Sequence, residues 1–135
     1  MKKADPTLSI HNTTRRNTDT ALFVTVKQLL LPKDYTLSVV LCGDARVQKL
    51  NKTYRQKEYT PNVLSFPVAK NEGEIFLNLA QIAREAARYQ HTPKEHLHYL
   101  LIHGCLHLDG YGHSSTMERA ECRAMQTLFP SYTCN

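Results

Sequence analysis

The chain has 135 residues, of which 41% are hydrophobic and 21% are charged, and its formal net charge is +5. These values are typical of a soluble globular protein, and the length fits one domain over residues 1–135 but not two. They exclude a membrane protein, because no apolar run approaches the roughly 20 residues of a membrane span.

The first third of the chain predicts a strand, a helix and a second strand. Residues 8–11 alternate polar and apolar side chains, as a short strand does. A helix follows, which Thr18 or Asp19 can cap and which Pro32 ends. Its predicted buried stripe consists of Leu22, Val26, Leu29 and Leu30. The β-branched and apolar run 36–41 predicts a buried strand.

The next predicted helix carries the densest basic patch of the sequence. Asp44 can cap this helix. Its predicted inward side chains are Val47, Leu50 and Tyr54. Its outward positions and its exit carry Arg46, Lys49, Lys52, Arg55 and Lys57. Such charges are most often a solvated helix face, but they are also what a surface that follows RNA phosphates requires, and both interpretations stay open here.

A hairpin and a further helix are predicted next. Residues 63–67 form a predicted strand whose terminal proline suits a sheet edge, and residues 74–77 form another. The polar segment 70–73 between them predicts the hairpin turn. Asn78 and Gln81 resemble a capping box. The inward side chains of the helix that they open are Leu79, Ile82, Ala83 and Ala86.

Two capped helices complete the predicted fold. Thr92–Glu95 is a capping box from which a helix runs to about Leu108. Its predicted core stripe consists of Leu97, Leu101, Gly104, Cys105 and Leu108. Glycine in mid-helix costs about 1 kcal/mol relative to alanine, so Gly104 predicts the close approach of another element. Ser115–Glu118 opens the last helix. Its inward side chains are Met117, Ala120, Ala124 and Leu128.

The predicted order of elements is β-α-β-α-β-β-α-α-α. It indicates an α+β fold, in which helices pack on one small mixed sheet of about four strands. The first residues carry charge without a hydrophobic segment behind them, so we predict no secretory signal and expect a cytoplasmic protein. The positive net charge favours polyanionic partners such as nucleic acid.

Three of the seven histidines lie within residues 103–113. His103 and His107 are four residues apart and therefore share one face of the predicted helix. Gly110 allows the chain to leave the helix in a left-handed conformation, and the turn that follows can bring His113 back toward the pair. Three neutral imidazoles are the ligand set of a catalytic zinc site whose fourth position holds water. The sequence therefore predicts a metal site in the C-terminal half, on a helix and its following turn.

Other features of the sequence limit this interpretation. His96 lies about 10 Å from His103 along the helix, so we expect it to be solvated or to support the site from outside. Metalloproteases of the H-E-x-x-H type need a glutamate where this chain has Gly104, which argues against a peptidase. The remaining histidines, His11, His91 and His98, are expected to be ordinary. The even number of cysteines could mean disulfides in a secreted chain, but nothing in the sequence suggests export, so reduced thiols are expected for Cys42, Cys105, Cys122 and Cys134, which form no C-x-x-C pair.

Two blocks of the sequence resemble the YbeY endoribonuclease family. Residues 103–113 are similar to the family pattern H-G-x-L-H-L-x-G-Y-D-H, and residues 50–55 and 62–67 are similar to L-N-x-x-Y-R and T-D-V-L-S-F-P. The segment 73–75 resembles the pattern G-D-I. The family has aspartate where this chain has Gly112 and Asn62; Asp109 is a candidate to replace the first of these carboxylates.

The resemblance implies a metal-dependent endoribonuclease that cleaves single-stranded RNA. It implies action in the maturation of the 3′ end of the small-subunit ribosomal RNA and in ribosome quality control. The implied cofactor is one divalent metal, with zinc expected first. The implied metal ligands, whose metal would activate a bound water, are His103, His107 and His113. Expected partners are single-stranded RNA and the small ribosomal subunit or its proteins, without DNA.

The predicted substrate-binding residues come from both blocks and from the basic helix. Arg55 matches the family's arginine, and its guanidinium can hold a phosphate with two hydrogen bonds and offset charge in the transition state. Lys49 and Lys52 extend the positive path. Ser65 is expected to line the cleft, either as a hydrogen-bond donor or as a structural residue. Two alternatives stay open: a non-catalytic, zinc-containing RNA- or ribosome-binding assembly factor, and a metal-dependent hydrolase of another substrate.

Overall fold

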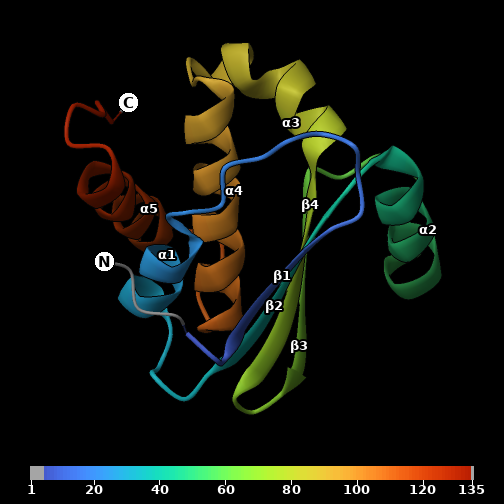
Figure 1. Ribbon diagram of the computed structural model, residues 1–135, viewed down its shortest axis with the longest axis horizontal. Coiled ribbons are helices and arrows are strands. Elements are labelled where there is room, and N and C mark those ends of the chain that lie inside the picture. Colours follow the sequence, from blue (N-terminus) through green and yellow to red (C-terminus); the bar gives the residue numbers. More distant parts are fainter. Residues whose placement is uncertain (1–4, 135) are drawn as a thin grey trace.

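The computed structural model describes residues 5–134 and has the predicted α+β fold (Figure 1). Its elements in chain order are β1 (Leu8–Asn12), α1 (Phe23–Leu30), β2 (Thr36–Cys42), α2 (Asp44–Arg55), β3 (Val63–Ala69), β4 (Glu72–Asn78), α3 (Leu79–Glu85), the 3₁₀ helix η1 (Ala86–Tyr89), α4 (Pro93–Leu108) and α5 (Ser115–Leu128). The order is the predicted one, with η1 as a short addition after α3. Within the described residues, no helix has both the length and the apolar character of a membrane span.

The four strands form one mixed sheet in the order β1-β2-β4-β3. β1 and β2 are parallel, β2 and β4 are parallel, and β3 runs antiparallel to β4 as the predicted hairpin. The turn is shorter than predicted, since β4 already begins at Glu72 and pairs there with Ala69. β3 is an edge strand, as expected from Pro67, which cannot donate a backbone hydrogen bond.

The sheet is covered on both faces, and α2 lies alone on one of them (Figure 1). Side chains alternate between the two faces along each strand. The larger core, formed with α1, α4 and α5, takes Val39 and Leu41 from β2 and Ile75 from β4. The smaller core beneath α2 takes the intervening residues Val40 and Phe76. Because both faces of the central strands are buried, their sequences are continuous apolar runs.

Helix α4 packs closely against the sheet, and its start follows the predicted capping box. The side chain of Thr92 accepts from the backbone of Glu95 at 3.1 Å, and Glu95 accepts from the backbone of Thr92 at 2.8 Å. A Cβ atom on Gly104 would lie 2.8 Å from Ser65 Oγ and 3.0 Å from Ile75 Cδ1. The predicted close approach is confirmed, and a protease-type glutamate would not fit at this position.

The predicted buried stripe of α1 is partly wrong. The helix begins at Phe23, and its buried residues are Phe23, Val26 and Lys27, whereas Leu29 is exposed. The ammonium group of Lys27 bonds to Asp5 Oδ2 at 3.1 Å. A buried lysine paired in this way looks like a surface residue in the sequence, so the periodicity of apolar residues misplaced the stripe.

The inward faces of α2 and α3 also differ from the prediction. Tyr54 is 70% exposed, and Asn51 is buried in its place, where its amide donates to the backbone oxygen of Tyr59 at 3.0 Å. On α3, Ala83 is exposed and Glu85 is buried. The fold supplies partners for both carboxylate oxygens of Glu85 and for the amide nitrogen of Asn51, whereas the buried Oδ1 of Asn51 has none among the described residues.

Three predicted helix caps are shifted. Helix α2 has Gly43 at its N-cap without a side-chain cap, and the predicted cap Asp44 is already the first residue of the helix. Among the described residues no side chain caps α1; Asp19 instead accepts from the backbone of Ala21 at 2.9 Å in the preceding turn. Helix α5 is capped by Ser114, whose hydroxyl accepts from the backbone of Met117 at 3.2 Å, and not by Ser115. Neighbouring serines are equivalent to a sequence pattern, so only the backbone conformation selects the cap.

The expectation of four reduced cysteines is wrong for one pair. Cys122 on α5 and Cys134 form a disulfide, because the segment after Leu128 turns back alongside α5. This pairing departs from what is usual in a cytoplasmic protein. Cys42 and Cys105 are free and buried; burial raises their thiol pKa values to about 11 and about 12. Both thiols therefore stay protonated at neutral pH.

Candidate metal centre and RNA cleft

His103, His107 and His113 converge at the end of α4. The first two lie one turn apart on the helix, and Gly110, with a φ of +97°, lets the chain leave it. One ring nitrogen from each histidine can be chosen such that all three lie within 4.8 Å of one another. The histidines predicted from their spacing are therefore brought together by the fold.

Hydrogen bonds to the outer ring nitrogens orient the two helical imidazoles. His103 Nδ1 lies 2.6 Å from Glu121 Oε2, and His107 Nδ1 lies 3.0 Å from the backbone oxygen of Tyr111. A carbonyl oxygen can only accept, so His107 Nδ1 carries a proton, and the carboxylate favours the same state of His103. In the neutral rings both Nε2 atoms then present lone pairs, and these atoms are 3.0 Å apart. This donor set fits a divalent metal between them.

The electrostatics of the cluster favour the neutral, metal-binding form of His107. Burial lowers the pKa of its imidazole, and the hydrogen bond to Tyr111 opposes this effect. The neighbouring rings of His103 and His113 lower it further. A neutral imidazole is the form that ligates metal ions.

Glu121 is the carboxylate of this site, and the sequence did not indicate it. It is buried on α5, one turn after Met117, and contacts His103 as described above. Asp109, the suggested substitute for the family's aspartate, is exposed at the end of α4. At Gly112, a Cβ atom would meet open space, so glycine is not required sterically there. An acidic residue within the apolar stripe of α5 was the available signal.

The three histidines line a cleft of about 730 Å³ that crosses the edge strand β3. The cleft is lined by Tyr54, Arg55, Tyr59, Asn62, Val63, Ser65, Phe66, His103, His107 and His113. Helix α2 contributes from one face of the sheet and α4 from the other, so the two similar sequence blocks meet at this edge. The ten lining residues include no carboxylate.

The other predicted site residues differ in whether they line the cleft with the three histidines. Arg55 is the last residue of α2 and lines the cleft together with the three histidines. Ser65 lies on β3, and its hydroxyl donates to the backbone oxygen of Gly104 at 3.2 Å. Lys49 and Lys52 are exposed on α2 and are not among the cleft-lining residues. Both lie on the same helix as the cleft-lining residues Tyr54 and Arg55.

His96 was expected to be solvated or to support the metal site, and both expectations are wrong. It is fully buried, and its Nε2 lies 2.6 Å from Glu85 Oε2. Its Nδ1 lies 3.0 Å from His91 Nδ1, and His91 Nε2 lies 2.8 Å from the hydroxyl of Tyr132. His91 is therefore not an ordinary surface histidine either. Glu85, His96, His91 and Tyr132 form a chain of hydrogen bonds with a buried inner end, which we call the Glu85 network.

The Glu85 network includes Asn62, the residue that stands where the resembled pattern has aspartate. The Asn62 amide donates to Glu85 Oε2 at 2.8 Å, and Gln81 donates to the other carboxylate oxygen at 3.0 Å. An aspartate at position 62 would place a second carboxylate against the first, which is unfavourable for both. Asparagine keeps the shape and supplies the donor that Glu85 needs.

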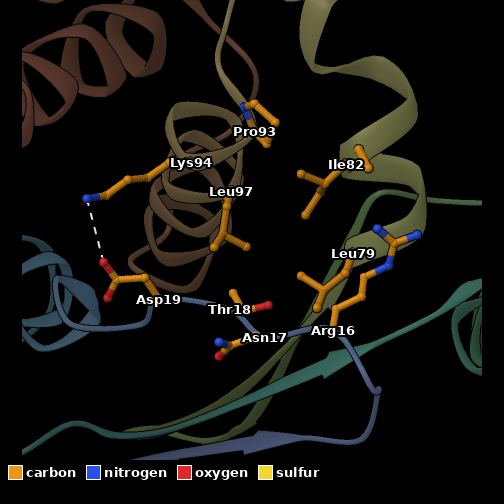
Figure 2. Close-up of a pocket in the computed structure, with 10 residues that line it drawn as sticks. Arg16, Asn17, Thr18, Asp19, Leu79, Ile82, Pro93, Lys94 and Leu97 are labelled. Atoms are coloured by element: carbon orange, nitrogen blue, oxygen red, sulfur yellow. Dashed lines mark ion pairs between the residues drawn. The ribbon is translucent and has the colours of Figure 1, made fainter.

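A second hollow, of about 460 Å³, lies between the segment 16–19, α3 and the start of α4 (Figure 2). Leu79, Ile82 and Leu97 give it an apolar wall, and Lys94 at its rim pairs with Asp19 at 3.6 Å. Its lining residues include no histidine or cysteine. The group of metal-ligating side chains thus lies in the β3 cleft and not here.

The fold and the site define a protein whose cleft, beside a basic helix, is lined by three histidines that could hold a metal ion. The chain belongs to the YbeY family, described as endoribonuclease YbeY, whose family model matches residues 1–131. This membership confirms the resemblance of the two sequence blocks. It also supports an endoribonuclease role, and hence RNA as substrate.

Individual relatives agree with the family assignment. Endoribonuclease YbeY of Lacticaseibacillus casei is 33% identical over 107 residues, which cover 70% of each chain. Endoribonuclease YbeY of Aromatoleum aromaticum is 36% identical over 97 residues, which cover 70% of this chain and 63% of that protein. The solution structure of TM1509 from Thermotoga maritima has a TM-score of 0.66 at 23% identity and covers 91% of this chain and 89% of its own. The last likeness concerns the fold alone.

Proposed function

We propose that this chain is a zinc-dependent endoribonuclease that cleaves single-stranded RNA in the cytoplasm. Its proposed role is maturation of the 3′ end of the small-subunit ribosomal RNA and ribosome quality control, in contact with the small subunit. The ribosomal part of the proposal rests on the family resemblance. The chemical part rests on one observation: the Nε2 atoms of His103 and His107 face each other at 3.0 Å while their Nδ1 atoms are already engaged.

The metal is proposed to be held by His103, His107 and His113. Imidazole ligands suit zinc, and three protein ligands leave a position open, as in catalytic rather than structural zinc sites. When bound, the metal would supply Lewis-acid polarisation of a phosphate oxygen and activation of water at neutral pH. Glu121 orients His103 and increases its basicity as a ligand.

The other cleft residues are proposed to bind and orient the RNA backbone. Arg55 can donate two parallel hydrogen bonds to the scissile phosphate and offset the negative charge that grows in the transition state. Lys49 and Lys52 attract the flanking phosphates toward the cleft. Ser65 holds the α4 backbone at Gly104, and its hydroxyl borders the substrate space.

The proposal is tested by offering metal-loaded protein several substrates. Single-stranded RNA, duplex RNA and a peptide pool are each incubated with the protein, with and without a chelator. We expect chelator-sensitive cleavage of single-stranded RNA only. RNA binding without cleavage would support the non-catalytic assembly factor, and peptide hydrolysis would support a hydrolase of another substrate.

The variant Arg55→Ala separates phosphate binding from metal binding. We expect cleavage to fall about 100-fold or more, since removing one preorganised transition-state donor has effects of this size. The metal content should stay that of the unmodified chain. Lys57→Ala, which removes an exposed cation from the same segment but outside the cleft lining, is the matched control and should retain cleavage. Loss of metal from Arg55→Ala would contradict the assigned role.

A further inference from the structure

The two most exposed tyrosine or phenylalanine residues among residues 5–134 both belong to the cleft. Tyr54 is 70% exposed and Tyr59 is 55% exposed, and both line the cleft beside Arg55. Large apolar side chains are usually buried, and Tyr54 occupies a helix position where the sequence pattern predicts burial. Two such rings beside the three histidines can bind a ligand that has flat apolar faces.

The ring of Tyr54 is supported from the side of the sheet by two phenylalanine rings. It meets Phe66 edge to face at a centroid distance of 5.9 Å, and Phe66 meets Phe76 in the same way at 5.9 Å. Phe76 is buried in the core beneath α2. This aromatic ladder fixes the tyrosine ring from the sheet side while its remaining surface stays open to solvent, so little ordering entropy would be lost on ligand binding.

The position of Tyr59 is fixed through its backbone. Asn51, which is fully buried on α2, donates to the Tyr59 oxygen at 3.0 Å, and its own backbone oxygen accepts from Lys57. Gln48 and Thr60 add a side-chain hydrogen bond of 2.6 Å between the same helix and loop. The α2–β3 loop is thereby pinned along the helix, with Tyr59 at the cleft.

The cleft is lined by a cation and by no acidic residue, so it favours an anionic ligand whose apolar faces can meet the two tyrosines. Arg55 directly follows Tyr54, and none of the ten lining residues is acidic. Aromatic rings beside a cationic path are the means by which proteins bind single-stranded nucleic acid, because every base offers a π-face and every linkage a phosphate. In a duplex the bases already stack on one another and cannot offer these faces.

We infer that Tyr54 and Tyr59 are the base-binding residues of the cleft, each stacking on a base of single-stranded RNA whose phosphate lies at Arg55. The inference rests on the proposed function and deepens it, since it assigns strand selectivity to two named side chains. Stacking is tolerant of base identity, so the cleft selects unpaired RNA and not a particular sequence.

The test is equilibrium binding of the full chain to two short RNAs of equal length and charge. One carries its bases, and the other has abasic riboses at its central positions. Fluorescence anisotropy is measured with chelator present, so that the probes stay intact. The variants are Tyr54→Ala, Tyr54→Phe, Tyr59→Ala and Tyr59→Phe. Val68→Ala, which changes an exposed apolar residue of β3 outside the cleft, is the control.

We expect the unmodified chain to bind the base-bearing RNA at least about fivefold more tightly than the abasic RNA. Each alanine variant should lose at least about fivefold in affinity for the base-bearing RNA and keep its affinity for the abasic RNA. The phenylalanine variants and the control should bind both RNAs as the unmodified chain does. Equal binding of the two RNAs by the unmodified chain would overturn the inference, as would phenylalanine variants as weak as the alanine variants.

A parallel cleavage assay with metal keeps this test distinct from that of the proposed function. Metal-loaded protein that cleaves RNA but binds it without regard to bases would disprove stacking and leave the nuclease standing. Base-dependent binding without chelator-sensitive cleavage would disprove the nuclease and leave the stacking residues standing.

Discussion

Helix α4 takes part in two histidine clusters that differ in what faces their ring nitrogens. At its end, His103 and His107 turn Nε2 atoms toward each other at 3.0 Å beside an open cleft. Two turns earlier, His96 is fully buried between Glu85 and His91, and each of its nitrogens has a partner. The same residue type on one helix is thus a candidate ligand at one end and a structural residue at the other.

The difference shows that the spacing of histidines is not sufficient to assign a metal site. His91 and His96 lie about as close together as His103 and His107, with ring centroids 5.2 Å and 4.5 Å apart. In the first pair, a carboxylate and a tyrosine complete a closed chain of hydrogen bonds. In the second pair, the outer nitrogens are hydrogen-bonded, and the two Nε2 atoms face each other where a ring nitrogen of His113 also lies nearby. Substitutions in the two clusters and in the basic helix should have effects of different kinds and sizes.

The largest expected effect is on folding. His96→Ala leaves the Glu85 carboxylate buried without its closest partner, and we expect a loss of about 3 kcal/mol or more in the free energy of unfolding. His113→Ala removes an exposed ring and should cost less than about 0.5 kcal/mol in metal-free protein. Denaturant unfolding with chelator present measures both values, and equal losses would remove the distinction between the clusters.

The next effect is on metal affinity. Glu121→Gln replaces the carboxylate that orients His103, and we expect zinc affinity to fall about 10- to 100-fold. Glu118→Gln makes the same change at an exposed position one turn earlier on α5 and should bind zinc like the unmodified chain. Competition with a chelating dye measures the affinities. If both variants bind alike, Glu121 has no part in the metal centre.

A smaller effect concerns the dependence of stability on pH. Burial alone would raise the pKa of Glu85, but hydrogen bonds from His96, Asn62 and Gln81 outweigh it and hold the pKa below its ordinary value. The carboxylate form therefore stabilises the fold above the pKa of the unfolded chain, and this contribution is lost as the pH falls through the folded-state value.

Glu85→Gln should accordingly be less stable than the unmodified chain at pH 7, with a flatter decline of unfolding free energy below about pH 4.5. Unfolding midpoints measured from pH 7 to pH 3 give both curves. Parallel curves would show that Glu85 does not contribute through its charge.

The smallest expected effect is on the salt dependence of RNA binding. Lys49→Ala should lower the slope of log affinity against log salt by about 0.7, the value for one lost phosphate contact with a single strand. Lys33→Ala removes an exposed lysine between α1 and β2, on a different part of the molecule, and should leave the slope unchanged. Anisotropy titrations at several salt concentrations measure the slopes; equal slopes would exclude Lys49 from the RNA path.

The sequence predicted the elements of this fold because most of them carry local signals. The capping box of α4, the proline at the edge strand and the close approach at Gly104 each follow from nearby residues and were found as expected. The convergence of the three histidines followed from helical spacing and a glycine at the helix exit. Local chemistry was sufficient for these features.

The remaining features depend on residues far apart in the sequence. Glu121 reaches His103 from 18 residues away, and Asn62 meets Glu85 from 23 residues away. Buried polar residues such as Asn51 read as surface residues, since only the folded chain shows their partners. The prediction that Tyr54 is buried was wrong for the converse reason. The pattern of apolar residues along a helix assigns an aromatic residue to the core, although the same residue can instead lie exposed in a binding cleft.

Zinc stoichiometry tests the assigned metal centre most directly. The unmodified chain, His107→Ala and His11→Ala are purified, loaded with zinc, freed of excess metal and analysed by elemental mass spectrometry. His11 is exposed on β1 and serves as the matched control. We expect about one equivalent of zinc in the unmodified chain and in His11→Ala, and far less in His107→Ala, because two imidazoles bind zinc much more weakly than three. A full equivalent in His107→Ala would contradict the three-histidine site.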